Sequence, residues 1–112
     1  MKKNFVQKVT NWGNFPIVEK NMKSEDSLQK IKDFVTSNNE VIARGNGRCY
    51  GDASLGENIF STHRLNKFIS FDHLNGIVEC ESGVLLSEIL EIVIPQGYFL
   101  HVTPGTKFIT IG

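Results

Sequence analysis

Two stretches of the chain place apolar residues at helical spacing. The first can begin at Ser24, a capping hydroxyl followed by two carboxylates, and can end at Asn38-Asn39. Its apolar stripe consists of Leu28, Ile31, Phe34 and Val35. The second stretch has a wider apolar face, made of Leu85, Leu86, Ile89, Leu90 and Val93, and its end is signalled by Pro95 and Gly97. We therefore expect two helices, the second of them packed rather than solvated.

Short apolar runs between these stretches indicate strands. The predicted strands are residues 17–20, 40–43, 58–61, 68–71, 77–80 and 98–100. Asn75-Gly76 can supply the positive φ values of a hairpin turn between residues 68–71 and 77–80. Residues 1–16 show no clear period, and we expect an irregular lead-in whose aromatic residues cover an edge of the domain.

The composition describes a small globular domain without a charge bias. A chain of 112 residues that is 40% hydrophobic can bury a core without disulfides. Twelve basic and twelve acidic residues cancel, which argues against non-specific binding to nucleic acid. Cys49 and Cys80 are too few for a secreted disulfide framework, so we expect free thiols. The interrupted N-terminal stretch is not a signal peptide and no run approaches about 18 apolar residues, so we expect a cytoplasmic protein.

The most informative stretch is R-G-N-G-R-C-Y-G-D-A, residues 44–53. Its three glycines can adopt positive φ without the roughly 1–2 kcal/mol that a Cβ would add there. Backbone N–H groups of such a loop can converge on an anion, and Arg44 and Arg48 could add positive charge. We interpret the stretch as a phosphate-cradling loop. An ordinary surface connection with several turns is the alternative.

The spacing differs from that of two familiar phosphate loops. The chain has no G-x-x-x-x-G-K-[ST], and its glycines follow G-x-G-x-x-x-G rather than G-x-G-x-x-G. A dinucleotide-binding loop also opens directly into a helix, whereas residues 52–58 have no helical period. The cradle is therefore expected to be loop backbone. A second turn-forming stretch, Thr103-Pro104-Gly105-Thr106, could face the same ligand.

Residue types that would indicate other chemistry are scattered. His63, His73 and His101 lie far apart in the sequence, and no cysteine or histidine pair has a zinc spacing, so we predict no metal site. Cys49 lies in the loop, but no histidine base is near it in sequence. The acidic residues of the second helix and of residues 79–81 fit solvated edges better than general acids. We assign no catalytic residue.

Four ordered segments resemble one protein family. They are R-G-N-G-R-C-Y-G-D, L-N-K-F-I-S-F-D, S-G-V-L-L-S-E-I-L and P-Q-G-Y-F-L-H-V-T-P-G-T-K-F-I-T-I-G. Together they look like the N-terminal part of FAD-linked oxidases with a vanillyl-alcohol-oxidase or p-cresol-methylhydroxylase (PCMH) type flavin domain, with a particular likeness to decaprenylphosphoryl-ribose oxidases and sugar-lactone oxidases. The resemblance covers nearly the whole chain from Trp12-Gly13. It implies an α+β module at residues 17–112, a small sheet flanked by two helices, equivalent to the first subdomain of a PCMH-type FAD-binding domain.

The resemblance also implies how the cofactor is held. The loop would wrap the FAD pyrophosphate mainly through backbone, and the C-terminal residues would approach the isoalloxazine side of the cofactor. The implied cofactor-binding residues are Ala43, Arg44, Gly45, Asn46, Gly47, Arg48, Cys49, Tyr50, Gly51, Asp52, Ala53, Gly105, Thr110, Ile111 and Gly112. Some relatives attach the flavin through a histidine at the position of Arg48. An arginine cannot do this, so we expect non-covalent FAD.

The function implied by the resemblance is flavin-dependent oxidation of a CH–OH group on a sugar or related alcohol. The partners would be FAD and this small molecule, with no nucleic acid and no membrane span. Relatives continue beyond the position of Gly112, so we expect the 112 residues to be a fragment that is inactive alone. Two alternatives stay open: a stand-alone module that binds a nucleotide diphosphate or a protein, and part of a flavin reductase of the sugar-nucleotide type.

Overall fold

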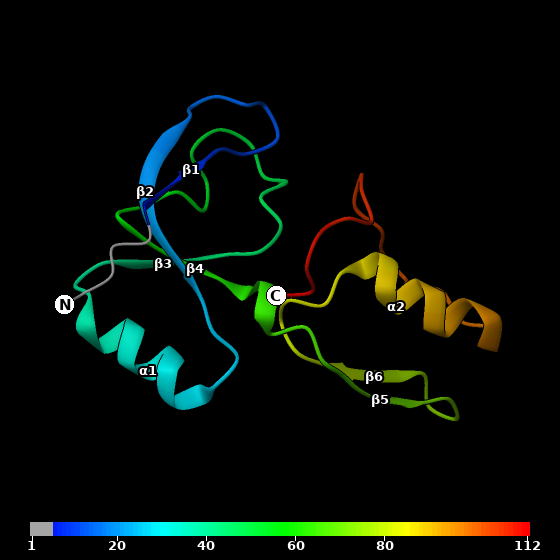
Figure 1. Cartoon of the computed structure of the whole chain (residues 1–112). Coiled ribbons are helices and arrows are strands. Elements are labelled where there is room, and N and C mark those ends of the chain that lie inside the picture. Colours follow the sequence, from blue (N-terminus) through cyan, green and yellow to red (C-terminus); the bar gives the residue numbers. More distant parts are fainter. Residues whose placement is uncertain (1–5) are drawn as a thin grey trace.

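The computed structural model describes residues 6–112, which form two sheets and two α-helices (Figure 1). In chain order the elements are β1 (Val6–Val9), β2 (Val18–Ser24), α1 (Leu28–Ser37), β3 (Val41–Arg44), β4 (Asn58–Ser61), β5 (Phe68–Asp72), β6 (Ile77–Cys80) and α2 (Leu86–Val93), with short 3₁₀ helices at Thr62–Arg64 and Ile94–Gln96. The mixture of helices and strands agrees with the predicted class. The expected single sheet between two helices is wrong, because β5 and β6 pair with each other and, among the described residues, with no other strand.

The larger sheet has the strand order β1-β2-β4-β3. β4 lies parallel to both β2 and β3, while β1 is antiparallel to β2. α1 connects β2 to β3, and its buried Phe34 packs against Phe60 of β4 with ring centroids 5.9 Å apart. Ser24, Arg44 and Ser61 are register partners at the carboxyl ends of the three parallel strands. The loop that follows β3 therefore starts at this edge of the sheet.

The first helix begins one turn later than the sequence pattern predicts. Ser24 is the last residue of β2 and pairs with Ser61, so it cannot cap a helix. The cap is Ser27, whose hydroxyl accepts from the Lys30 N–H at 3.4 Å. Glu25, which is 8% exposed, instead forms an ion pair with Lys23 at 3.2 Å. The pairing of β2 with β4 thus overrides the local capping signal.

Residues Val6–Val9 form a strand, so the prediction of an irregular segment at residues 1–16 is wrong for this part. β1 pairs with β2 from Val6↔Asn21 to Val9↔Val18, and Val9 is buried. Four residues are too few to show a two-residue period, and the strand forms because β2 offers an edge to pair with. Residues 1–5 lie outside the described part of the chain.

The other half of the molecule is α2 packed on the hairpin of β5 and β6. The hairpin pairs Phe68 with Cys80 and Asp72 with Ile77, which confirms the two strands predicted there. The centre of this half consists of the buried side chains of Val84, Leu86, Ile89 and Val93, surrounded by Phe71, Val78, Cys80, Tyr98, Leu100 and Ile109. The wide apolar face of the second helix is thus buried, as its pattern predicts.

The prediction of a strand at residues 98–100 is wrong. The Tyr98 N–H donates to the Val93 carbonyl at 3.1 Å, which closes the end of α2 after Gly97 (φ 86°). The Tyr98 hydroxyl donates to the carbonyl of His73 in the hairpin turn. This segment is apolar because it covers the core below α2, and no strand of the described residues lies beside it.

Asp72 organises the turn of the hairpin. Its carboxylate accepts from the Asn75 side chain at 2.7 Å and from the N–H groups of Leu74 and Asn75 at 3.0 and 3.2 Å. Gly76 completes the turn with φ 69°. The hydrogen bonds from Asn75, with the side-chain bond first, lower the pKa of Asp72 because they favour its charged form.

This lowered pKa predicts a pH dependence of folding. Stability from such a carboxylate is fully present above its unfolded pKa of about 4 and is lost as the pH falls through the lower folded pKa. We expect Asp72→Asn, which cannot titrate, to lose less unfolding free energy than the wild type between about pH 5 and pH 2. Urea denaturation across this range measures the difference, and identical pH slopes would contradict it.

The two halves of the molecule meet at a narrow junction around Gly83. The Gly83 N–H donates to the Leu65 carbonyl at 2.7 Å, and a Cβ at Gly83 would lie 2.6 Å from that oxygen and would also meet the carbonyl of Thr62. The molecule measures 49 × 34 × 17 Å, and its radius of gyration of 15.9 Å exceeds the roughly 13 Å of a compact domain of this length. Figure 1 shows the two halves side by side, with few elements between them.

Candidate functional site

The loop at residues 44–53 leaves the carboxyl end of β3 and adopts the backbone conformations that its glycines permit. Gly47 and Gly51 have φ values of 65° and 58°, as the glycine pattern predicts. Gly45 is needed for a different reason, because a Cβ there would meet the side chain of Thr110, with Cγ2 at 3.2 Å. Two glycines thus shape the loop, and the third lets a distant segment approach it.

The loop leaves a run of backbone donors unused. Within residues 6–112, the N–H groups of residues 46–52 have no protein acceptor. The pairing resumes with the Ala53 N–H, which donates to the Tyr50 carbonyl at 3.3 Å, and the Leu55 N–H, which donates to the Asp52 carbonyl at 3.0 Å. Successive free N–H groups in a glycine-rich turn form a concavity that suits an anion.

The two arginines of the loop have different environments. Arg44 points into the protein: its guanidinium donates to the Thr10 carbonyl at 2.6 Å and to side-chain oxygens of Asn11 and Ser54 at 2.5 and 3.2 Å. Burial lowers the pKa of Arg44, but an arginine stays protonated. Arg48 is exposed and forms no ion pair with any described residue. Arg44 therefore supports the loop, while Arg48 is the arginine open to an external ligand.

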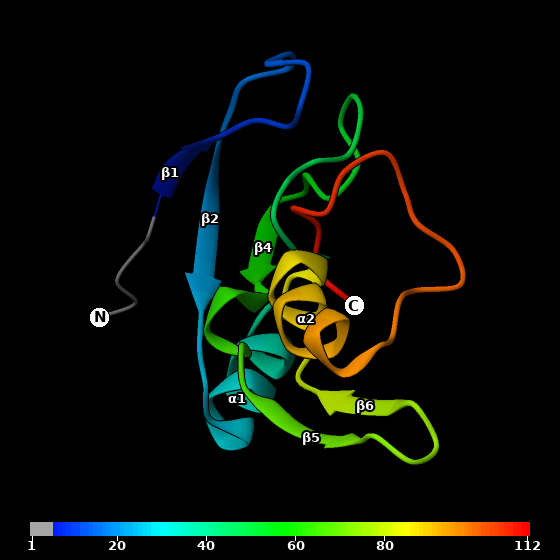
Figure 2. The ribbon, with the colours of Figure 1, turned by 90° about the vertical axis from the view of Figure 1, so that its right-hand side faces the viewer.

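The C-terminal residues form a second wall beside the loop. The Asn46 side chain donates to the Phe108 carbonyl at 2.8 Å, and Thr110 lies against Gly45. The structure thus brings together the first half of the loop and residues 108–110, whereas the second turn predicted from the sequence is residues 103–106. The segment that follows α2 forms an open arc (Figure 2). Gly105 belongs to this segment by sequence, is exposed, and would have no neighbour within 4 Å of a Cβ.

The start of α2 holds this second wall in place. The N–H groups of Leu86 and Ser87 donate to the carbonyls of Ile109 and Lys107, both at 2.9 Å. Leu85 has no polar side chain for capping, but its own N–H donates to the Glu88 carboxylate at 2.7 Å. Glu88 and the C-terminal segment therefore replace the missing cap, a compensation that local sequence does not reveal.

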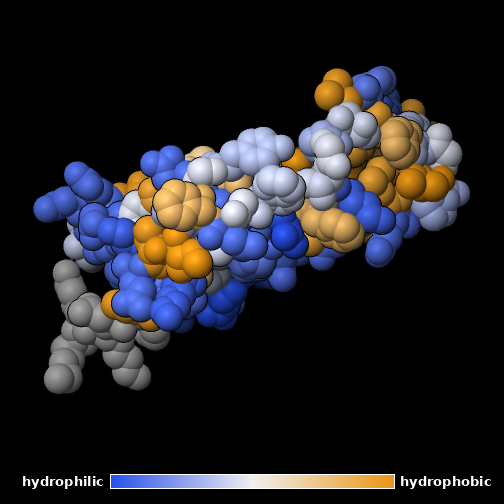
Figure 3. All heavy atoms as spheres, turned by 90° about the horizontal axis from the view of Figure 1, so that it is seen from above, coloured by the Kyte–Doolittle hydropathy of each residue, from blue (hydrophilic) through white to orange (hydrophobic). Residues whose placement is uncertain are grey.

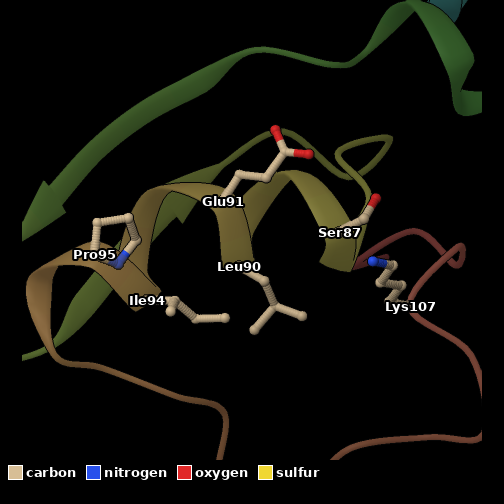
Figure 4. Close-up of a pocket in the computed structure, with 6 residues that line it drawn as sticks. All are labelled: Ser87, Leu90, Glu91, Ile94, Pro95 and Lys107. Atoms are coloured by element: carbon tan, nitrogen blue, oxygen red, sulfur yellow. The ribbon is translucent and has the colours of Figure 1, made fainter.

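A hollow of about 260 Å³ lies on α2, away from the loop (Figure 4). It is lined by Ser87, Leu90, Glu91, Ile94, Pro95 and Lys107. Leu90 and Ile94 point into the same space in Figure 4, so the lining is mainly apolar. It includes no residue of the loop, and it offers few donors for a phosphate. This hollow is therefore distinct from the predicted phosphate site.

Exposed aromatic side chains stand beside the loop. Trp12 and Tyr50 are 64% and 77% exposed and meet edge to face, with ring centroids 5.5 Å apart. Seen from above, strongly apolar side chains gather at the two ends of the molecule, with more polar ones between them (Figure 3).

Cys49 is a free thiol whose Sγ lies 3.2 Å from the Ala53 carbonyl, and Cys80 is also free.

Other kinds of site are absent from the described residues. Residues 6–112 contain no group of three His, Cys, Asp or Glu side chains arranged to hold a metal ion. In the same range, no helix has the length and apolar character needed to cross a membrane.

Comparison with known proteins shows the family of the chain. The family model described as FAD binding domain matches residues 18–112. The chain belongs to this FAD-binding family. Its cofactor is therefore FAD, and the range that the family model matches includes the loop and both helices.

Two curated relatives show the extent of the similarity. Decaprenylphosphoryl-beta-D-ribose oxidase of Mycolicibacterium smegmatis is 36% identical over 74 residues, which are 64% of this chain and 16% of that protein. D-lactate dehydrogenase of Anaerostipes hadrus is 35% identical over 63 residues, which are 55% of this chain and 13% of that protein. The matched stretch thus spans less than a fifth of the length of either relative.

The loop of this FAD-binding chain fits the diphosphate of the cofactor. The donors of residues 46–52 are backbone groups, which bind phosphate oxygens without adding side-chain bulk. Gly51 has open space where a Cβ would lie, so a ligand can approach the backbone closely. Both features agree with a pyrophosphate held by loop backbone rather than by a helix N-terminus.

Proposed function

We propose that this chain supplies the pyrophosphate-binding wall of the FAD site in an oxidoreductase that acts on a CH–OH group of a sugar or related alcohol. The run of free N–H groups at residues 46–52 carries the proposal. The substrate class is supported by the relatives' names, which refer to a ribose derivative and to lactate. Both compounds contain a carbon that bears a hydroxyl group.

In this proposal the flavin supplies the capacity to accept a hydride when it is bound, and the chain binds and orients the cofactor. Within the predicted binding stretch, residues 43–53, the free N–H groups of residues 46–52 would hold the pyrophosphate, and exposed Arg48 would add positive charge. Residues 110–112, of which Thr110 lies against Gly45, would form the wall of the site toward the flavin ring. The module would correspond to the first subdomain of a PCMH-type domain.

Purification of the complete protein, followed by anaerobic mixing with D-lactate and with aldoses, tests this function. We expect bound flavin whose visible absorbance is bleached by one of these alcohols. Bleaching by NADPH alone would favour the flavin reductase instead. A colourless protein that binds ADP but not FAD would contradict the proposal and favour a module for nucleotide diphosphates.

The linkage between flavin and protein gives a separate prediction. A covalent bond requires a nucleophile that can reach the flavin ring, and a guanidinium such as that of Arg48 has no lone pair available for the attack. Cys49 is the other candidate in the loop, but its thiol lies against Ala53 and Ser54. We expect acid precipitation to leave the flavin in the supernatant. Flavin that stays in the pellet and maps by peptide mass to Cys49 would contradict this expectation.

A further inference from the structure

We propose that Asn11 is a positioning residue for FAD: it sets the direction of the N–H groups in the loop that binds the pyrophosphate. Asn11 precedes residues 18–112, the part of the chain that the family model matches. The inference rests on the proposed role of the loop, and it adds to that role a residue from outside the matched region.

The side chain of Asn11 is buried and fully engaged with the loop. It is 3% exposed, and its amide nitrogen donates to the carbonyls of Gly51 and Ala53 at 3.0 and 2.5 Å. Its amide oxygen accepts from Arg44 at 2.5 Å. Next to it, the Trp12 N–H donates to the Cys49 carbonyl at 3.2 Å. Both amide donors and an amide acceptor lone pair are thereby used.

These contacts fix the peptide planes of the loop. In a trans peptide the carbonyl of one residue and the N–H of the next point in opposite directions. The carbonyls of Cys49 and Gly51 are held toward residues 11–12, so the N–H groups of Tyr50 and Asp52 point away from them. Both N–H groups belong to the run without a protein acceptor. Asn11, which holds the Gly51 carbonyl, and the Trp12 N–H, which holds the Cys49 carbonyl, therefore keep these oxygens away from the side on which an anion would bind and the N–H donors toward it.

The test compares three variants of the complete protein. Asn11→Ala removes the contacts, while Asn11→Asp keeps an acceptor for Arg44 but places a carboxylate oxygen against the two carbonyls. Asn21→Ala is the matched control, because Asn21, in β2, likewise uses its side-chain amide as a donor, to Asn58 at 2.9 Å, and makes none of the contacts with the loop that are described for Asn11. The measurements are the FAD dissociation constant, the unfolding midpoint without FAD, and the ³¹P spectrum of bound FAD.

We expect both Asn11 variants to bind FAD about tenfold or more weakly, since two hydrogen bonds that orient the loop are lost. We also expect the ³¹P signals of the pyrophosphate to shift in both Asn11 variants. In Asn21→Ala the ³¹P signals should stay where they are, and the FAD dissociation constant should change only as far as the loss of stability explains. A wild type that binds no FAD would overturn the function of the loop and this inference together.

Other results would overturn the positioning role alone. One is a wild type that binds FAD while the Asn11 variants bind it equally well with unchanged ³¹P signals. Another is a loss of affinity that follows the loss of stability in the same proportion for Asn11 and Asn21 variants. Failure of both Asn11 variants to fold in the presence of FAD would show that Asn11 serves the fold as a whole, and would also overturn it.

Discussion

Replacing Gly83 by alanine should lower the free energy of unfolding by about 3 kcal/mol, at the upper end of the usual cost of overpacking. The added Cβ would meet the carbonyl oxygens of Thr62 and Leu65, which are backbone atoms and cannot rotate away. Moving them would break the hydrogen bond from the Gly83 N–H to Leu65. Because Gly83 lies at the junction of the two halves, the substitution should also weaken the contact between the two halves. Urea denaturation measures the loss.

Gly13→Ala is the control for this prediction. A Cβ at Gly13 would have no neighbour within 4 Å, and its φ lies outside the left-handed region. The free energy of unfolding of Gly13→Ala should stay within about 0.5 kcal/mol of the wild-type value. If Gly83→Ala is as stable as Gly13→Ala, the junction is not as tight as the structure shows.

The second large effect concerns the cofactor: Gly47→Val in the complete protein should lose most of its flavin. Gly47 has φ 65°, a β-branched residue disfavours this conformation, and a Cβ would meet the guanidinium of Arg44. The side chain would therefore displace Arg44 and alter the N–H cradle. Since a hydrogen bond to a charged group contributes about 1.5–3 kcal/mol, losing one weakens FAD binding at least roughly tenfold. Flavin content after purification measures the loss.

Gly97→Val separates backbone strain from the loss of the site. Gly97 also has positive φ, 86°, but it ends the 3₁₀ helix Ile94–Gln96 that follows α2, and it has open space around its Cβ position. The two variants should therefore lose similar stability, while only Gly47→Val loses flavin. Full flavin occupancy in folded Gly47→Val would contradict the assignment of the loop.

Local patterns in the sequence predicted the parts of the fold that depend on local interactions. The hairpin follows from two short apolar runs and Gly76, and α2 follows from its wide apolar face. The glycines of the loop predicted positive φ, which Gly47 and Gly51 adopt. Each of these features is specified by residues within one or two turns of chain.

Features that depend on distant residues were not predictable in this way. β1 forms by pairing with β2, and α1 begins late because Ser24 pairs with Ser61. The sequence predicted that Arg44 could add charge at a phosphate, whereas in the structure its guanidinium donates to Asn11, 33 residues earlier in the chain. Asn11 itself gave no sequence signal, since an asparagine in an aperiodic segment looks like an ordinary turn residue.

The most direct test of the cofactor site is an NMR titration of the ¹⁵N-labelled chain with FAD, in which even weak binding moves amide signals. We expect the largest shifts at residues 46–52, whose N–H groups have no protein acceptor among the described residues, and smaller ones near Thr110. Shifts confined to the apolar hollow around Leu90 and Ile94, with the loop signals unmoved, would contradict a pyrophosphate site in the loop.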